Sequence, residues 1–152
     1  MMNYYMPMIN HVLIDANILV GLVLREDRHH LDAVRLIRTL LAENKILVTN
    51  NYIFSEACTI TLLRGKDMEH VKILKHDFCG SEEKLISITH IKPDWESNIF
   101  NLFMKQKKYR SGYLSYSDCS LIVQARKNKI KAICTFDEDL QQFSDEFDII
   151  GV

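Results

Sequence analysis

The sequence predicts an α/β fold in which a mainly parallel, twisted β-sheet carries helices on both faces. Short apolar segments alternate with longer stretches whose apolar residues recur at helical spacing. A strand followed by a helix and then another strand indicates a parallel crossover, and such crossovers cover both faces of a sheet with helices. With 152 residues, 47% hydrophobic content and only two prolines, the chain fits one domain over residues 1–152.

The first half of the chain carries signals for strands and for the ends of helices. The apolar run before Asp15 predicts a strand, and Asn17 is expected to cap the apolar helix after it. Asn50 or Asn51 can begin a later helix, which Gly65 is expected to end. In order, we expect a strand over 11–14, helices over 18–24 and 29–44, a strand over 46–48, and helices over 51–64 and 67–79.

The second half repeats the alternation. Pro93 suits the first turn of a helix. Short apolar runs on either side of the helical stretches predict the remaining strands. In order, we expect a strand over 85–88, helices over 93–109 and 117–128, a strand over 132–134, a short helix over 138–143 and a strand over 147–150.

Charge, hydropathy and cysteine content exclude several classes of protein. A net charge of −1 argues against binding nucleic acid through bulk positive charge. The longest apolar run, 18–24, is far shorter than the roughly 20 residues of a membrane-spanning helix, and the first residues lack the features of a secretory signal. We therefore expect a cytoplasmic protein. Four scattered cysteines are expected to be buried and reduced: Cys58, Cys79, Cys119 and Cys134.

Four carboxylates stand out by their positions. Asp15 and Asp137 each follow an apolar strand, at the sheet edge where α/β proteins bind ligands. Glu56 and Asp118 each lie on the apolar side of a helix, where an acid is rarely buried without a partner. Taken singly, the three aspartates also fit a turn, a helix cap or an acidic first helical turn, and Asp139 could replace Asp137. Glu56 could instead line a polar cleft at the rim of the core.

Acids that converge on one edge of a sheet repel one another unless a cation neutralises them. Ligands that are all oxygen suit hard cations, which favours Mg²⁺ or Mn²⁺, and no pair of histidines has zinc-like spacing. His29 and His30 are expected to begin a helix. The four carboxylates therefore predict a site for one or two divalent ions.

The order and spacing of several segments resemble the PIN-domain ribonucleases, and among them the VapC-like toxins of bacterial and archaeal toxin–antitoxin pairs. The matching segments are LIDANIL, REDRHHLDAVRLI, YIFSEACTITLLRG and SYSDCSLIVQARKNKIKAICTFDEDL. The resemblance covers nearly the whole chain. It implies metal binding by four acids, namely Asp15, Glu56, Asp118 and Asp137, supported by the polar residues Asn17, Ser117 and Thr135.

The resemblance also implies a reaction and partners. The reaction is hydrolysis of RNA phosphodiester bonds, leaving a 5′-phosphate. The implied partners are a second copy of the chain, in a homodimer, and a small antitoxin that covers a groove between the early helices and reaches toward the acids with a basic side chain.

Basic residues just before the third acid could contact RNA. Lys107, Lys108 and Arg110 could hold the backbone, and the neighbouring tyrosines could stack on a base, although the same residues also suit an ordinary helix end. Two further interpretations remain. One is a PIN-like module that binds RNA or protein without cutting, and the other is a receiver-type domain that accepts a phosphoryl group on its acidic cluster.

Overall fold

A six-stranded sheet lies at the centre of the structure, a computed structural model that describes residues 8–80, 84–110 and 112–152. The strands follow the order β3-β4-β2-β1-β5-β6, and each neighbouring pair runs parallel. The mainly parallel α/β fold predicted from the alternating pattern is confirmed. The strands are β1 (His11–Ile14), β2 (Ile46–Asn50), β3 (Cys79–Gly80), β4 (Ile86–Thr89), β5 (Ala132–Cys134) and β6 (Asp148–Ile150).

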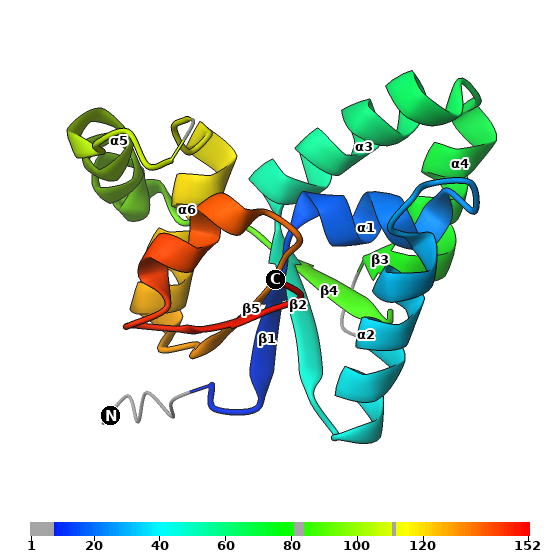
Figure 1. The fold of residues 1–152 in the computed structure, drawn as a ribbon, viewed down its shortest axis with the longest axis horizontal. Helices are drawn as coiled ribbons and strands as arrows, with labels where there is room; N and C mark the ends of the chain where they lie inside the picture. The colour runs from blue at the N-terminus through cyan, green and yellow to red at the C-terminus, as the bar shows by residue number, and fades with distance from the viewer. Residues whose placement is uncertain (1–7, 81–83, 111) are drawn as a thin grey trace.

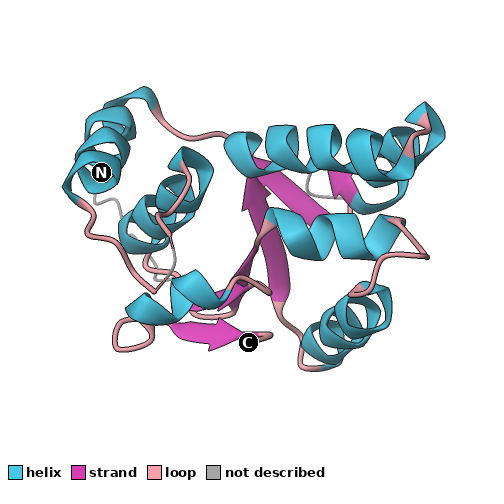
Figure 2. Ribbon diagram, turned by 45° about the horizontal axis from the view of Figure 1, so that its top comes forward, coloured by secondary structure: helices cyan, strands magenta, loops and turns pink. Residues whose placement is uncertain are grey.

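Helices cover both faces of this sheet. Figure 1 shows α5 and α6 on one side and α1 and α2 on the other, with α3 crossing above α1. Figure 2 shows the strands enclosed between these two groups of helices. The helices are α1 (Ala16–Val23), α2 (His30–Ala42), α3 (Asn51–Gly65), α4 (Met68–Ile73), α5 (Glu96–Lys105) and α6 (Tyr116–Asn128), with shorter turns η1 (Leu74–Phe78), η2 (Pro93–Trp95) and η3 (Glu138–Phe143).

The core lies where the central strands meet α1 and α6. Every residue of β1 after His11 is buried, as expected for a strand covered on both faces. The helix α6 buries an unbroken run from Asp118 to Ala125, and α1 is buried along nearly its whole length. These two apolar helices therefore fix the sheet edge from which both begin.

Two predicted helix ends are wrong. The cap of α1 is Asp15, not Asn17, because the Asp15 side chain accepts a hydrogen bond from the Ala16 N–H. Gly65 is still helical, and Lys66 takes the left-handed conformation with φ of 55°. A Cβ at Gly65 would lie 2.8 Å from Leu24 Cδ2, so a larger residue there would require the neighbouring Leu24 and His70 side chains to shift.

Two predicted helices differ from the expectation in their second half. The helix expected over 67–79 is α-helical to Ile73 and then continues as the π-helical turn η1 to Phe78, where the Cys79 N–H bonds to the Leu74 carbonyl and leads the chain into β3. The helix expected to reach residue 109 stops at Lys105. The Gln106 side chain instead pairs with the Leu114 backbone, at 2.7 and 3.0 Å, and so anchors a loop.

The structure also bears on the predicted state of the cysteines and on the search for a membrane-spanning helix. All four thiols are free; three are buried, whereas Cys58 is only half-buried. In the described part of the chain, none of the helices combines the length and apolar character needed to cross a bilayer.

Candidate active site

The carboxyl ends of β1 and β5 form the edge at which the candidate site is built. From β1 the chain passes to β2 on one side, while β5 pairs with β1 on the other. Such a reversal of strand order leaves a crevice beyond the strand ends, where open α/β sheets bind ligands. Asp15 directly follows β1, and Asp137 follows β5 by three residues. The topology therefore places these two acids at the expected position.

Asp15 is held by both of its carboxylate oxygens. Oδ1 accepts a hydrogen bond from the Ala16 N–H at 2.7 Å, and Oδ2 accepts one from the Thr135 hydroxyl at 2.7 Å. The residue is only 3% exposed. Its main chain continues the sheet, because the Asp15 N–H bonds to the Cys134 carbonyl at 3.0 Å. The position of this carboxylate is thus set by the sheet itself.

Thr135 and Asn17 connect the ends of β1 and β5. The Thr135 hydroxyl, which donates to Asp15, accepts from the Asp137 N–H at 2.9 Å. The Asn17 side chain donates to the same hydroxyl at 3.4 Å and accepts from the Phe136 N–H at 3.1 Å. Asn17 therefore serves as a bridge between the first and last acid-bearing segments, although it is not the helix cap.

Asp118 is fixed by the start of α6. Ser115 caps the helix, and its hydroxyl accepts from the Asp118 N–H at 3.0 Å, while Asp118 Oδ2 accepts from the Ser115 N–H at 3.0 Å. This reciprocal capping box satisfies two helix-terminal N–H groups. Asp118 is 9% exposed, so the capping box holds a nearly buried carboxylate.

Glu56 reaches the site from α3 through one contact. Its Oε2 accepts a hydrogen bond from the Ser117 hydroxyl at 2.8 Å. Ser117 in turn lies 3.0 Å from the Ser115 hydroxyl that caps α6. This contact brings the acid of α3 beside the acid of α6, which are 62 positions apart in the chain. Glu56 is half-buried.

Burial and mutual repulsion raise the pKa of the two innermost acids. Burial and then the Asp118 and Glu56 charges raise the pKa of Asp15 to about 7, against hydrogen bonds from Thr135 and Ala16 that lower it. Burial, followed by the charges of Asp137 and Glu56, raises the pKa of Asp118 to about 6. Each of the four acids is therefore close enough to at least one other for their charges to interact.

Asp137 and Asp139 differ in their interactions with the other acids. Asp137 raises the pKa of Asp118, so its charge acts within the site. Asp137 Oδ1 also accepts from the Asp139 N–H at 2.9 Å, which makes Asp137 the cap of η3. The Asp137 charge thus reaches Asp118, which supports Asp137 as the candidate fourth acid.

The donor set suits a hard divalent cation. Carboxylate oxygens are the ligands that Mg²⁺ and Mn²⁺ prefer. A cation would offset both the burial of these charges, which is the main cause of the two raised pKa values, and their repulsion. Across residues 8–80, 84–110 and 112–152, no three histidine, cysteine, aspartate or glutamate side chains lie close enough to hold one ion as they stand. The chemistry of the site thus fits a cation, whereas its side chains stand further apart than ligands of one ion.

The family model of the PIN domain matches residues 12–146, which include all four acids and their hydrogen-bonding partners. The chain belongs to the PIN domain family. The family inferred from the four sequence segments is therefore confirmed.

A solved structure shares this PIN fold. It is the crystal structure of VapC20 from Mycobacterium tuberculosis, described as a toxin that cleaves the sarcin-ricin loop. The TM-score is 0.69 at 17% sequence identity, with 93% of this chain and 98% of VapC20 covered. No curated protein matches the sequence.

The basic residues considered for RNA contact lie on the loop after α5 of this PIN domain. Lys107 and Lys108 are exposed. The Arg110 guanidinium donates to Glu138 and to Gln141, each at 3.2 Å, and lies 5.4 Å from the Tyr109 ring centre. Arg110 is therefore engaged with η3, while the two lysines extend into solvent.

The sequence analysis did not identify Glu96 of α5, whose carboxylate contacts the elements that carry two of the candidate acids. Glu96 accepts hydrogen bonds from the Tyr52 and Tyr116 hydroxyls, at 3.2 Å for Tyr116. The hydrogen bond to Glu96 and burial raise the pKa of Tyr52 to about 12. Tyr52 lies one turn before Glu56, and Tyr116 directly precedes Ser117. The helical spacing of Tyr52 and Glu56 was visible in the sequence, but the link from α5 was not.

A second missed feature is a buried amide network beneath the site. Asn50 Oδ1 caps α3 by accepting from the Ile53 N–H at 2.9 Å. Its Nδ2 donates to Ser120 at 3.1 Å and to Gln124 at 3.0 Å, both on α6. Gln124 then donates to Thr89 of β4 at 2.7 Å. One buried side chain thereby joins the helices that carry Glu56 and Asp118.

Proposed function

We propose that the chain is a Mg²⁺- or Mn²⁺-dependent endoribonuclease that hydrolyses RNA phosphodiester bonds. PIN domains form a family of nucleases, and this chain belongs to it. The observation that carries the proposal is the pair of buried acids, Asp15 and Asp118, whose pKa values are raised to about 7 and about 6. Burying two repelling acids is costly to a fold, and a divalent ion in the crevice offsets that cost.

In this proposal Asp15, Glu56, Asp118 and Asp137 hold the metal. The bound ion lowers the pKa of water and stabilises charge on the phosphate. The protein's own residues orient the acids. Thr135 fixes one oxygen of Asp15, and Ser117 fixes one oxygen of Glu56. Asn17 holds the segment that carries Asp137 against the start of α1.

The choice of RNA rests on the resemblance of the motif segments to VapC-like toxins, and the fold shared with VapC20 is consistent with it. Lys107, Lys108 and Arg110 belong to the same proposal as candidate RNA contacts. The cleavage products are expected to carry a 5′-phosphate, which end-labelling of the fragments would detect.

Partners follow from the same resemblance. A toxin of this type is expected to form a homodimer and to be inhibited by a small antitoxin. Large apolar side chains are exposed on α3 and at the start of α4, with Leu63 69% and Met68 60% exposed. Exposed apolar groups on neighbouring helices support a protein partner there. Size-exclusion chromatography with light scattering would test the homodimer, and co-expression with the product of an adjacent reading frame would test the antitoxin.

The proposed activity is tested with purified protein and a panel of single-stranded and structured RNAs. Cleavage is expected with Mn²⁺ or Mg²⁺, and is expected to stop with chelator and in Asp15→Asn. Asp145→Asn is a matched control, because Asp145 is an exposed acid outside the cluster. Undiminished cleavage by Asp15→Asn, or in chelator, would contradict the proposal.

The alternative of a non-cutting PIN-like module makes a different forecast. Such a module would bind Mn²⁺ or RNA yet leave every RNA intact, in protein shown by mass spectrometry to carry no co-purified inhibitor. Growth arrest on expression that disappears in Asp15→Asn would favour the toxin over this alternative.

A further inference from the structure

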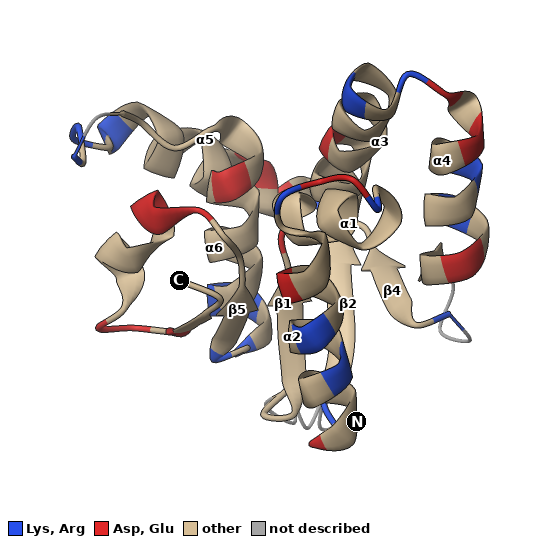
Figure 3. Ribbon diagram, turned by 45° about the vertical axis from the view of Figure 1, so that its right-hand side comes forward, with Lys and Arg blue, Asp and Glu red and all other residues tan. Residues whose placement is uncertain are grey.

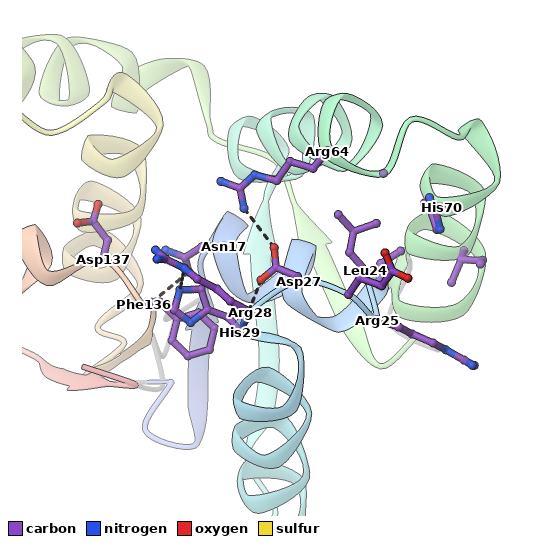
Figure 4. A pocket seen from close by; sticks show the side chains of 14 residues that line it. Asn17, Leu24, Arg25, Asp27, Arg28, His29, Arg64, His70, Phe136 and Asp137 are labelled. Atoms are coloured by element: carbon purple, nitrogen blue, oxygen red, sulfur yellow. Dashed lines mark hydrogen bonds and ion pairs between the residues drawn. The ribbon is translucent and has the colours of Figure 1, made fainter.

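A groove runs from the candidate acids across the loop between α1 and α2. Its volume is about 1130 Å³, and its walls come from that loop, the end of α3, the side of α4 and the residues after β5. Asn17 and Asp137 line one end, and Arg64 and His70 lie along it. Figure 4 shows these side chains around the same space. The groove therefore reaches the carboxylate cluster at Asp137.

A cation and two aromatic rings form the wall of the groove nearest the acids. The His29 ring stacks on the Phe136 ring, with centroids 4.5 Å apart and an interplanar angle of 16°. Arg28 Nε donates to His29 Nε2 at 3.1 Å. In Figure 4 the Arg28 side chain extends toward Asn17 and Phe136, whereas Arg25 points away from them. Phe136 directly precedes Asp137, so the stack places Arg28 beside an acid-bearing segment.

The loop that carries Arg28 is held in place by its own hydrogen bonds. The Asp27 carboxylate accepts from the His29 N–H at 2.8 Å, and the His30 N–H bonds to the Asp27 carbonyl at 2.9 Å. His30 Nδ1 lies 2.7 Å from the Gly21 carbonyl, which fixes the loop to α1. Arg28 therefore projects from a pre-organised turn, which reduces the entropy that ligand binding would cost.

The acids of the loop do not neutralise Arg28. Figure 3 shows the loop as an acidic segment flanked by basic ones. Asp27 is paired with Arg64 at 3.3 Å, and its side chain is only 8% exposed. Within the described residues, Arg28 makes no ion pair. The guanidinium group thus retains donors that face the groove.

We propose that Arg28, oriented by the His29–Phe136 stack, binds a backbone phosphate of the RNA strand that enters the carboxylate cluster. The inference rests on the proposed nuclease function and names a contact for its substrate. A guanidinium group matches phosphate oxygens with paired N–H donors and remains charged at every working pH. A phosphate held there lies on the path to Asn17 and Asp137, because all three residues line one groove.

RNA fits this position better than an acidic peptide. The groove ends at acids that are proposed to hold a phosphodiester-cutting ion, so a strand of regularly spaced phosphates can occupy both places at once. Arg28 then offsets the repulsion between that strand and the acids at the groove end. This role differs from that of Lys107 and Lys108, which lie on the loop after α5.

The test measures binding of a fluorescent 20-nucleotide single-stranded RNA in chelator, where no cutting is expected. Arg28→Gln is expected to weaken binding about tenfold, as for loss of a charged hydrogen bond. The slope of log affinity against log salt should fall by about 0.7, the value for one phosphate contact on a single strand. His29→Phe keeps a stacked ring but removes the acceptor for Arg28, and should weaken binding by a smaller factor.

Arg38→Gln is the matched control. Arg38 is an exposed arginine on α2, and the substitution removes the same charge outside the groove. It should leave both affinity and salt slope close to those of the parent. Thermal unfolding of each variant checks that it is folded, which is expected because Arg28 is exposed.

The outcomes separate this inference from the proposed function. If the parent cuts and binds RNA but Arg28→Gln behaves like Arg38→Gln, the inference is wrong and the nuclease proposal stands. If the parent neither binds nor cuts any RNA, both are wrong. If a glutamate-rich peptide of equal charge binds as tightly as RNA and loses affinity equally in Arg28→Gln, the groove is a peptide site and the inference is overturned.

Discussion

The four acids of this PIN domain fall into two pairs that are held in different ways. Asp15 and Asp118, the inner pair, are 3% and 9% exposed and are fixed by main-chain N–H groups at the starts of α1 and α6. Glu56 and Asp137, the outer pair, are half-buried. Glu56 is held by a serine hydroxyl, and Asp137 caps only the short turn η3.

This difference shows which part of the site the fold determines by itself. The inner pair is positioned by the sheet edge and by helix capping, so its location follows from the formation of secondary structure. In the described residues no three acids stand at ligand distance from one ion. If a cation binds, we expect closure chiefly by Glu56, held by the Ser117 hydroxyl, and by Asp137, whose Oδ1 accepts from the Asp139 N–H of a short turn.

The largest effect is expected from neutralising the inner pair. Asp15→Asn should reduce metal-dependent cleavage by about 10²–10³-fold, since a metal contribution of several kcal/mol is lost. The metal-free variant should unfold at a higher temperature than the parent above pH 7, because a buried, repelled charge has been removed. Cleavage rates and thermal unfolding in chelator measure the two effects. A variant that is both inactive and destabilised at that pH would instead indicate structural damage.

A smaller loss of cleavage activity is expected from substitution in the outer pair. The size of this loss distinguishes Asp137 from the neighbouring Asp139. Asp137→Asn should reduce cleavage by about 10–100-fold, because the more loosely held acids are expected to contribute less to the ion than the inner pair. Asp139→Asn should stay within about twofold of the parent. Single-turnover rates at saturating Mn²⁺ would compare them. If both variants lost cleavage activity equally, Asp137 would not be the sole fourth ligand.

The hydroxyl that holds Glu56 should matter through metal affinity. Ser117→Ala leaves the carboxylate in place but removes its hydrogen bond, so Mn²⁺ affinity should fall about tenfold. Ser97→Ala, at an exposed position on α5, is the control. Calorimetric titration with Mn²⁺ reports this directly. Parent-like affinity in Ser117→Ala would mean that Glu56 is positioned by something other than this contact.

The smallest effect concerns the pH dependence of stability in metal-free protein. The pKa of Asp15 is raised from 3.8 to about 7, so between these pH values the folded state binds more protons than the unfolded state. Its contribution to stability is present at low pH and is lost as pH rises toward and through 7. Asp118, with a pKa raised to about 6, acts in the same direction.

The effect of Asp15 on the pH dependence of stability is isolated by comparing the parent with a variant that lacks this acid. Burial lowers the pKa of His11, which gives stability an opposite slope over part of this range. Melting temperatures at pH 5.5 and 8 in chelator should therefore be compared between the parent and Asp15→Asn. The parent should lose more stability with rising pH than the variant, and added Mn²⁺ should reduce this loss because metal binds the deprotonated acids. Identical slopes in the two proteins would contradict a raised pKa at Asp15.

Local patterns in the sequence were sufficient to predict the fold, and they led to the hypothesis of a four-acid site. Strand ends identify Asp15 and Asp137, and an acid on an apolar helix face identifies Glu56 and Asp118. The family match over residues 12–146 agrees with that selection of segments. Helix ends were less well predicted, because Asn17 bonds to Thr135, 118 positions away, instead of capping its own helix.

The features that the sequence did not predict all depend on contacts between distant segments. Glu96 accepts a hydrogen bond from Tyr52, which is 44 positions away in the sequence. His29, near the start of the chain, stacks on Phe136, near its end. Neither contact has a local signal, since a glutamate at a helix start and a histidine before a helix are ordinary residues there. Such contacts follow from the packing of elements, which periodicity and capping rules do not specify.

The buried amide of Asn50 has a consequence for how the molecule opens. Because it caps α3 and also bonds to Ser120 and Gln124 of α6, fraying of the first turn of α3 that displaced Asn50 would remove the hydrogen bond to the buried Gln124 Oε1. The beginnings of the two helices should therefore exchange their amide hydrogens as one cooperative unit, with similar protection against deuterium. In kinetic terms, the helix segments that carry Glu56 and Asp118 would separate only in rare joint openings.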